Sequence, residues 1–216
     1  MKISYALALF AASALILSGC SSSAQAVAQG TPTQTASPGP SVEPSQTSSP
    51  AASPSASPLI NAHGNIVKKV GEFAGAGGTS AADGTLKFKV TSIEPISCDS
   101  PYSTRPAGTA LAVALEVETT ANFKGGLTMN NESGLTSFMA NYWKGYTPDG
   151  TRMNKVDTVA VQSCVADQSR LLPDTIGKGE KAAGIVILEV TTPTGTIAYD
   201  GAGMTSGGWE WDYRAK

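Results

Sequence analysis

The chain has 216 residues, of which 15 are Lys or Arg and 17 are Asp or Glu, giving a formal net charge of −2. A near-neutral balance without a basic run argues against nucleic-acid binding, because phosphate backbones are held by clustered Lys and Arg. The single histidine, His63, leaves little scope for histidine-based metal sites or acid–base chemistry. Charged residues make up 15% of the chain, and 23 Gly and 13 Pro favour turns over long helices.

The amino-terminal segment has the features of a secretory signal. Lys2 supplies a positive charge, and residues 5–17 then form an uncharged apolar run of 13 residues. A helix needs about 20 apolar residues to cross a bilayer, so this run is too short for a permanent span. A cationic start, an apolar middle and small residues at the end are typical of a signal peptide, which we place at residues 1–19.

The tetrapeptide Leu17-Ser18-Gly19-Cys20 follows the apolar run directly. It resembles the lipobox of bacterial lipoproteins. The resemblance implies that the Cys20 thiol receives a diacylglyceryl group, that the chain is cut before Cys20, and that a further acyl chain such as palmitate is added to the new amino terminus. Two or three acyl chains suffice for stable anchoring, because each buried methylene contributes about 0.8 kcal/mol. The alternative is an ordinary signal peptide with a chance cysteine.

Residues 20–60 read as a disordered linker. From residue 21 to residue 60, 29 of the 40 residues are Ser, Pro, Ala or Thr, and only Glu43 is charged. Such a segment has too little apolar surface to offset the entropy lost on ordering its backbone. We expect a lipid-anchored tether, either bare or carrying sugars on its hydroxyl groups.

Residues 61–216 contain short segments with the alternation of β-strands. Residues 110–118 place four apolar side chains on one face, namely Leu111, Val113, Leu115 and Val117. Residues 85–90 repeat the pattern, and the phase then slips, which predicts a bulge or a strand end near Thr91 and Ser92.

Five further segments complete the expected strands. An aromatic-rich stretch at residues 137–147 ends in the turn Pro148-Asp149-Gly150. The other four expected strands are residues 158–164, 184–190, 196–199 and 209–213. No window of 11 or more residues shows a convincing helical apolar stripe. The pattern predicts an all-β fold, an antiparallel β-sandwich over residues 61–216.

Cys98 and Cys164 remain once Cys20 is assigned to lipid. Outside the cytoplasm, two leftover cysteines in one small domain are most simply joined as a disulfide. The alternative, a redox-active or metal-binding pair, needs CxxC spacing or further ligands, and the sequence offers neither.

Several short pieces occur in the order found in a known group of domains. They are Val70-Gly71-Glu72, Pro106-Ala107-Gly108-Thr109, Pro148-Asp149-Gly150 and Gly179-Glu180. With the strands between them, residues 70–213 resemble the immunoglobulin-like domains of unknown function in lipoproteins and secreted proteins of Gram-positive bacteria, a group akin to a mycobacterial secreted antigen. The resemblance implies an immunoglobulin-like sandwich and supplies no activity or catalytic residue.

Candidate catalytic groups are few. His63 stands at the junction of linker and domain, where we expect it to be exposed and without an orienting partner. Glu116 and Glu118 share a strand face and are either a carboxylate pair for glycoside cleavage or part of a solvated surface. Four aspartates, Asp149, Asp157, Asp167 and Asp174, are scattered without the spacing of a calcium loop.

Three aromatic residues are candidates for binding. Tyr142 and Trp143 are adjacent in an expected strand and would face opposite ways, so at least one could be exposed together with Tyr146. Exposed aromatic rings anchor protein partners or stack on sugars. The alternative is that these rings fill the core and the space under a neighbouring loop.

These observations together favour a non-enzymatic protein. We expect a lipoprotein on the extracellular face of the cell membrane, attached through Cys20 and carrying a binding or structural β-sandwich. Its expected partner is an envelope protein or a wall polymer, with no cofactor, metal or nucleic acid. The alternative is an enzyme, or an enzyme accessory, that acts on cell-wall polysaccharide through carboxylates alone.

Overall fold

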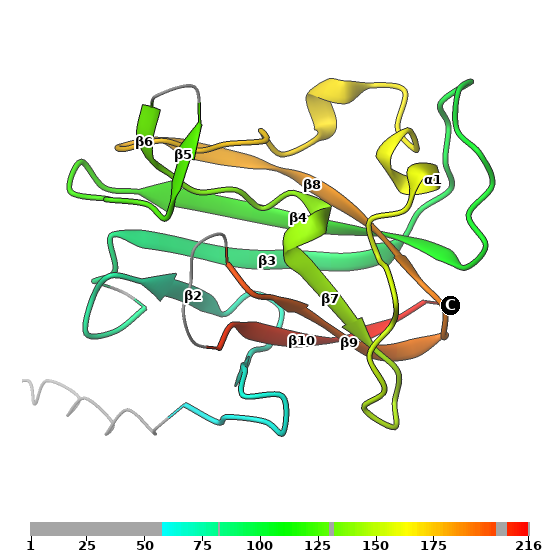
Figure 1. Ribbon diagram of the computed structural model, residues 1–216, viewed down its shortest axis with the longest axis horizontal. Helices are drawn as coiled ribbons and strands as arrows, with labels where there is room; N and C mark the ends of the chain where they lie inside the picture. The colour runs from blue at the N-terminus through cyan, green and yellow to red at the C-terminus, as the bar shows by residue number, and fades with distance from the viewer. Residues whose placement is uncertain (1–57, 82, 130–131, 202–206, 216) are drawn as a thin grey trace, which may run out of the picture. The chain divides into compact units, whose positions relative to one another are not determined.

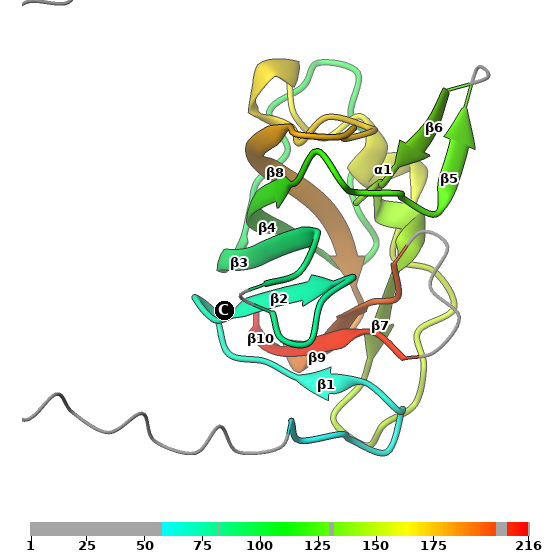
Figure 2. The same ribbon diagram turned by 90° about the vertical axis from the view of Figure 1, so that its left-hand side faces the viewer.

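The computed structural model describes residues 58–81, 83–129, 132–201 and 207–215. The expected signal peptide, Cys20 and nearly all of the expected linker lie outside these residues. Within the described part, no helix has both the length and the apolar character needed to span a membrane. The described residues belong to one compact unit, in which two β-sheets pack face to face (Figures 1 and 2).

Each of the two sheets has four strands. The first has the order β2 (Phe73–Ala76), β3 (Leu86–Pro95), β4 (Thr109–Thr119), β8 (Lys181–Val190), and all its neighbours are antiparallel. The second has the order β1 (Ile66–Val67), β10 (Trp209–Arg214), β9 (Thr194–Tyr199), β7 (Trp143–Tyr146). Its neighbours are antiparallel except that β1 runs parallel to β10. The predicted all-β sandwich is therefore confirmed, and among the described strands the pair β1 and β10 departs from the expected antiparallel arrangement.

The remaining strands form a small hairpin, β5 (Leu127–Met129) and β6 (Glu132–Leu135). It projects at the end of the unit away from α1 (Figure 1). β1, β2 and this hairpin could not be predicted, because segments of two to four residues are too short to show a repeating pattern.

Aromatic rings fill the space between the sheets. Phe88 of β3 lies edge-on to Phe138 and to Trp209, with ring centroids 4.9 Å apart in both pairs. Tyr199 stacks on Phe138 at 4.3 Å, and its hydroxyl donates a hydrogen bond to the Ser137 carbonyl. Edge-on and offset stacked pairs are favoured by the quadrupoles of the rings. The alternation along β3, β9 and β10 delivers these rings to a single core.

The expected irregularity in β3 is confirmed. The pairing of β3 with β4 shifts register between Val90 and Ser92. Before the shift, Phe88 and Val90 point into the core, and after it the inward position passes to Ile93. One extra residue in the strand thus accounts for the phase slip in the sequence.

The strand expected at residues 158–164 is wrong. This segment contains a one-turn helix, α1 (Val159–Gln162), in which the Gln162 N–H donates to the Thr158 carbonyl. A second short turn, the 3-10 helix η2 (Gln168–Arg170), follows. The β-branched residues favoured a strand, but Val161 and Val165 are four apart and lie on the same side of the coil, where they pack on β8.

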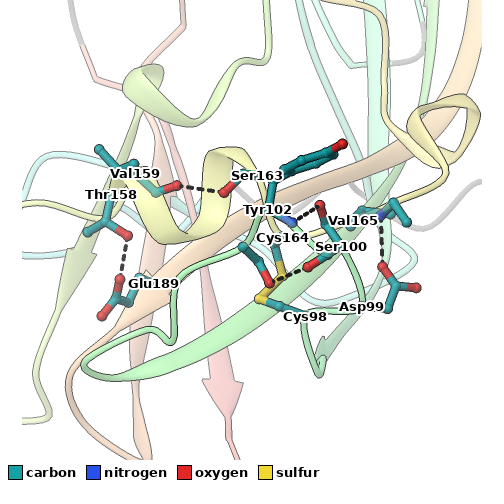
Figure 3. Close-up of a disulfide and its surroundings, with 12 residues drawn as sticks. Cys98, Asp99, Ser100, Tyr102, Thr158, Val159, Ser163, Cys164, Val165 and Glu189 are labelled. Atoms are coloured by element: carbon teal, nitrogen blue, oxygen red, sulfur yellow. Dashed lines mark hydrogen bonds between the residues drawn. A yellow bond between two sulfur atoms is a disulfide. The ribbon is translucent and has the colours of Figure 1, made fainter.

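We call residues 156–172 the flap, because they cover part of the outer face of the first sheet. Val161 and Val165 pack on Ile187 of β8 and on Ala110 of β4. These residues form a second, small apolar core. The predicted disulfide is present and joins Cys164 in the flap to Cys98, which lies between β3 and β4 (Figure 3). The cross-link therefore fastens the flap to the sheet that it covers.

A buried carboxylate secures the start of the flap. Glu189 of β8 is 5% exposed and accepts a hydrogen bond from the Thr158 hydroxyl (Figure 3). It also accepts one from the Gly108 N–H at 2.7 Å. Thr158 is the residue immediately before α1. Because a buried charge needs such partners, these contacts fix both the flap and the turn before β4.

Replacing Cys98 and Cys164 together with Ser is expected to lower the free energy of unfolding by about 4 kcal/mol. The bond closes a loop of 66 residues, and its loss returns that freedom to the unfolded chain. Urea unfolding without reductant measures the effect. Adding reductant should lower the free energy of unfolding of the native chain by a similar amount and leave that of the double variant unchanged. A double variant as stable as the native chain would contradict the prediction.

Candidate functional site

None of the three aromatic binding candidates is an exposed ring. Trp143 is 4% exposed, and its indole N–H donates to the Phe138 carbonyl at 2.9 Å. Tyr142 lies in the 3-10 helix η1 (Ala140–Tyr142), outside the strand, so the alternation assumed for it does not apply. It packs against the main core. Trp143 and Tyr146 are thus buried and Tyr142 is half-buried, which agrees with the alternative that these rings pack into the fold. A binding role for them stays a prediction.

Tyr146 points to the outer face of β7 but is covered by the histidine. The imidazole of His63 stacks on its ring with centroids 3.8 Å apart and planes 10° apart. His63 Nδ1 lies 3.0 Å from a carboxylate oxygen of Glu210 on β10. The expectation that His63 has no orienting partner is thus wrong, because the chain before β1 folds back over this sheet.

Glu210 is the centre of this polar cluster. It is 3% exposed and accepts hydrogen bonds from Asn65 Nδ2 at 2.8 Å and from the Thr196 hydroxyl at 2.5 Å. Burial has the largest single effect and raises the pKa of its carboxyl, but hydrogen bonds from Asn65, Thr196, Asn61 and His63 together outweigh burial. The pKa of Glu210 therefore lies below its ordinary value, and the charged form is favoured.

The hydrogen bonds of this cluster hold the segment before β1 against β10. Asn65 also accepts a hydrogen bond from the Gly208 N–H at 2.9 Å, which ties residues 61–65 to the start of β10. The other ring nitrogen of His63 faces the turn at Gly150, and none of the described residues bonds to it. In the described part of the chain, no Ser, Thr or Cys side chain bonds to this nitrogen, a contact that a nucleophile–histidine–carboxylate arrangement would make.

The carboxylates considered for glycoside cleavage do not form a desolvated pair. Glu116 and Glu118 do share a surface groove of about 400 Å³ on the outer face of β4. Lys89 lies 2.8 Å from Glu116, and Lys181 lies 3.4 Å from Glu118. Their side chains are 57% and 40% exposed, so the groove lacks the water-excluding environment that a glycosidase acid requires.

Of the four aspartates, Asp157 and Asp174 line one hollow, which is described below, and the other two lie in separate turns. Asp149 lies in the turn after β7, where it accepts a hydrogen bond from the Thr151 N–H. Asp167 accepts one from the Ser169 N–H in the flap. Among the described residues, no group of three or more His, Cys, Asp or Glu side chains is placed to hold a metal ion.

A different hollow, which the sequence did not reveal, lies along the free edge of β8. Its volume is about 370 Å³. We call it the β8-edge groove. Its apolar lining comes from three parts of the chain: residues 138–140, the flap, and residues 185–187 of β8. Its polar lining residues are Asn141, Asp157, Gln162, Gln168 and Asp174.

The β8-edge groove was missed because no sequence motif marks it. Its walls are 138–141, 157–174 and 185–187, which are brought together only by the sandwich and the flap. A strand was expected at residues 158–164, so the groove wall that α1 forms there could not be predicted. Met139 lines the groove and is 42% exposed, but nothing in the sequence around it indicates that exposure.

Comparisons with known proteins give similarity at the level of structure. No protein-family model matches the chain, and no curated protein is significantly similar to it. A secreted protein of Mycobacterium tuberculosis, MPT63, aligns with 69% of this chain and 98% of its own, at 19% identity and a TM-score of 0.45.

Two proteins of Bacillus subtilis align as well. The putative lipoprotein ycdA covers 61% of this chain with 37% of its own, at 13% identity and a TM-score of 0.39. The protein yjhA covers 68% of this chain with 98% of its own, at 12% identity and a TM-score of 0.41.

Glu210→Gln is expected to lower the free energy of unfolding at neutral pH by about 1–3 kcal/mol, because hydrogen bonds to a carboxylate are stronger than those to an amide. The pKa of Glu210 is lower in the folded chain than its ordinary value of 4.5. Its stabilisation is therefore complete above that value and is lost as the pH falls through the folded-state pKa.

The measurement is denaturant unfolding of both proteins between pH 7 and pH 3. The difference between them should shrink below pH 4.5. Glu116→Gln is the control, because an exposed ion pair contributes no more than about 1 kcal/mol. A difference that stays constant to pH 3 would show that the charge of Glu210 is not what stabilises the fold.

Proposed function

We propose that this chain is an extracellular lipoprotein, anchored through Cys20, whose β-sandwich is a non-enzymatic binding module with the β8-edge groove as its binding surface. We also propose that it belongs with the immunoglobulin-like domains of Gram-positive lipoproteins that its sequence resembles. The observation that carries the binding role is the groove itself. A volume of about 370 Å³ falls within the size range of ligand sites, which are mostly apolar hollows with a few polar groups.

The cross-link supports both parts of the proposal. A disulfide between Cys98 and Cys164 persists outside the cytoplasm, where the proposed anchor would place the domain. It also holds the flap, so that one wall of the groove is already in position before any ligand arrives. A preformed wall reduces the entropy lost on binding.

The linker supports the anchoring proposal. The segment between Cys20 and the domain has one charged residue, Glu43, and seven prolines. We propose on this composition that the segment is an extended tether, which gives the domain reach from the membrane surface. A tether with a folded domain at its outer end suits binding to partners in the envelope.

Cys20→Ala is expected to abolish acylation and to release the protein from the membrane fraction, because no other residue can take the thioether-linked lipid at this position. Labelling cells of a Gram-positive host with a clickable palmitate analogue, followed by membrane fractionation, measures both effects. Ser22→Ala is the matched control and should keep both label and membrane association. Equal labelling of the Cys20→Ala and native chains would refute the anchor.

Gln162→Trp is expected to weaken binding to the envelope partner at least tenfold, because a bulky ring at a lining position of α1 fills the groove. Val159→Trp is the matched control, since Val159 lies on the same helix, is 68% exposed and does not line the groove. Pull-down of purified wall glycans and of separated envelope proteins by each full chain measures the effect. Equal binding by the two variants would exclude the groove as the binding surface.

A further inference from the structure

The register of β8 leaves the backbone groups of Ile187, a residue that is 5% exposed, directed toward the edge of the sheet. β8 is an edge strand, since β4 pairs with one side of it and no described strand pairs along the other. The Ala110 carbonyl accepts a hydrogen bond from Ile96, so Ala110 and every second residue after it direct their backbone groups toward β3. Ala112 is one of these, and its partner in β8 is Ile187. The N–H and C=O of Ile187 therefore point away from β4, toward the free edge.

The free edge is occupied on both sides of this position. The Leu172 N–H donates to the Ile185 carbonyl at 3.0 Å, and the Glu189 N–H donates to the Val156 carbonyl at 2.8 Å. The two ends of the flap thus cap the edge. Between them, none of the described residues bonds to the outward backbone groups of Ile187, which lines the groove. An unpaired stretch of edge is a template for an added strand.

Acidic residues lie on both sides of the unpaired backbone at Ile187. Asp157 follows Val156, which caps one side, and Asp174 comes two residues after Leu172, which caps the other. No described lining residue of the groove is Lys or Arg. Lys155 lies 3.9 Å from Asp157, but Asp174 has no ion-pair partner among the described residues.

We infer that the β8-edge groove binds a short extended peptide segment of another protein, one that carries apolar residues next to Lys or Arg. Its backbone pairs with the N–H and C=O of Ile187, an apolar side chain enters the groove, and a cationic side chain approaches Asp157 or Asp174. Strand addition of this kind draws affinity from main-chain hydrogen bonds and specificity from the pockets beside the edge. The inference rests on the proposed binding role of the groove and specifies its ligand.

The chain's own linker fits this site poorly. Residues 21–60 contain no Lys or Arg, and seven of them are prolines, which lack the N–H that pairs with a sheet edge. An acidic segment would be opposed by both aspartates. The negative charges of Asp157 and Asp174 therefore favour a basic peptide over both the chain's own linker and an acidic segment.

The test uses three synthetic peptides and the full chain in detergent micelles. The first is acetyl-Lys-Val-Leu-Val-Lys-amide, the second replaces both lysines with glutamate, and the third carries an N-methyl group on the leucine amide. We expect the first peptide to bind at least tenfold more tightly than either of the others by calorimetry. We also expect it to slow amide hydrogen exchange at Ile187 at least tenfold.

Variants assign the charge effect. Asp157→Asn and Asp174→Asn together should reduce the affinity for the lysine peptide at least fivefold. The affinity for the glutamate peptide should stay the same or rise. Asp212→Asn is the control, because Asp212 is exposed on β10 and lies outside the groove. An equal loss in Asp212→Asn would show a general charge effect and would overturn the inference.

The other outcomes separate this inference from the proposed function. Equal binding of the lysine and N-methyl peptides would overturn strand addition, and tighter binding of the glutamate peptide would overturn the charge assignment. Concentration-dependent dimerisation that Gln162→Trp abolishes would identify a second copy as the occupant. Failure of every peptide to bind would also overturn the inference, while envelope binding that depends on Gln162 would still support the proposed function.

Discussion

The arrangement of this domain depends on covering the outer face of β4 and β8. Ala110, Ile185 and Ile187 lie on that face, where a bare sandwich would leave them in water. The flap covers them, and a covering of two short helical turns has little stability of its own. The bond between Cys98 and Cys164 supplies the missing constraint, because it ties the flap to the chain between β3 and β4. The same constraint brings Leu172 to the edge of β8 and so creates the groove.

Two buried carboxylates hold irregular segments at the periphery of the fold through their hydrogen bonds. Glu189 and Glu210 both occupy outward positions on strands, yet each is almost fully buried. Glu189 accepts its hydrogen bonds from the start of the flap, and Glu210 accepts its bonds from the segment before β1. Each thus fixes an irregular segment to a regular strand. Burial of an acid is often a sign of catalysis, but here the donors around each one are sufficient to explain it.

The sequence predicts the parts of this fold that depend on local alternation. The apolar faces of β4 and β10 and the irregularity after Val90 all follow from a period of two. The segment at α1 could not be predicted in this way, because Val159, Val161 and Val165 favour a strand and only packing on β8 selects the coil. The expected exposure of His63 is confirmed, but its hydrogen-bond partner could not be predicted, for a related reason. Its partner Glu210 is 147 residues away, and no local signal reports that distance.

The unpaired backbone of Ile187 contrasts with the rest of the β8 edge, which the flap covers. Exposed edges invite pairing between copies of a chain, and proteins usually cover or charge them. Here the flap covers the edge at Ile185 and Glu189, and aspartates flank the gap. Two copies meeting edge to edge at this gap would bring four carboxylates together, which opposes self-association. A basic segment meets the same charges favourably, so one arrangement of side chains both discourages aggregation and selects a partner.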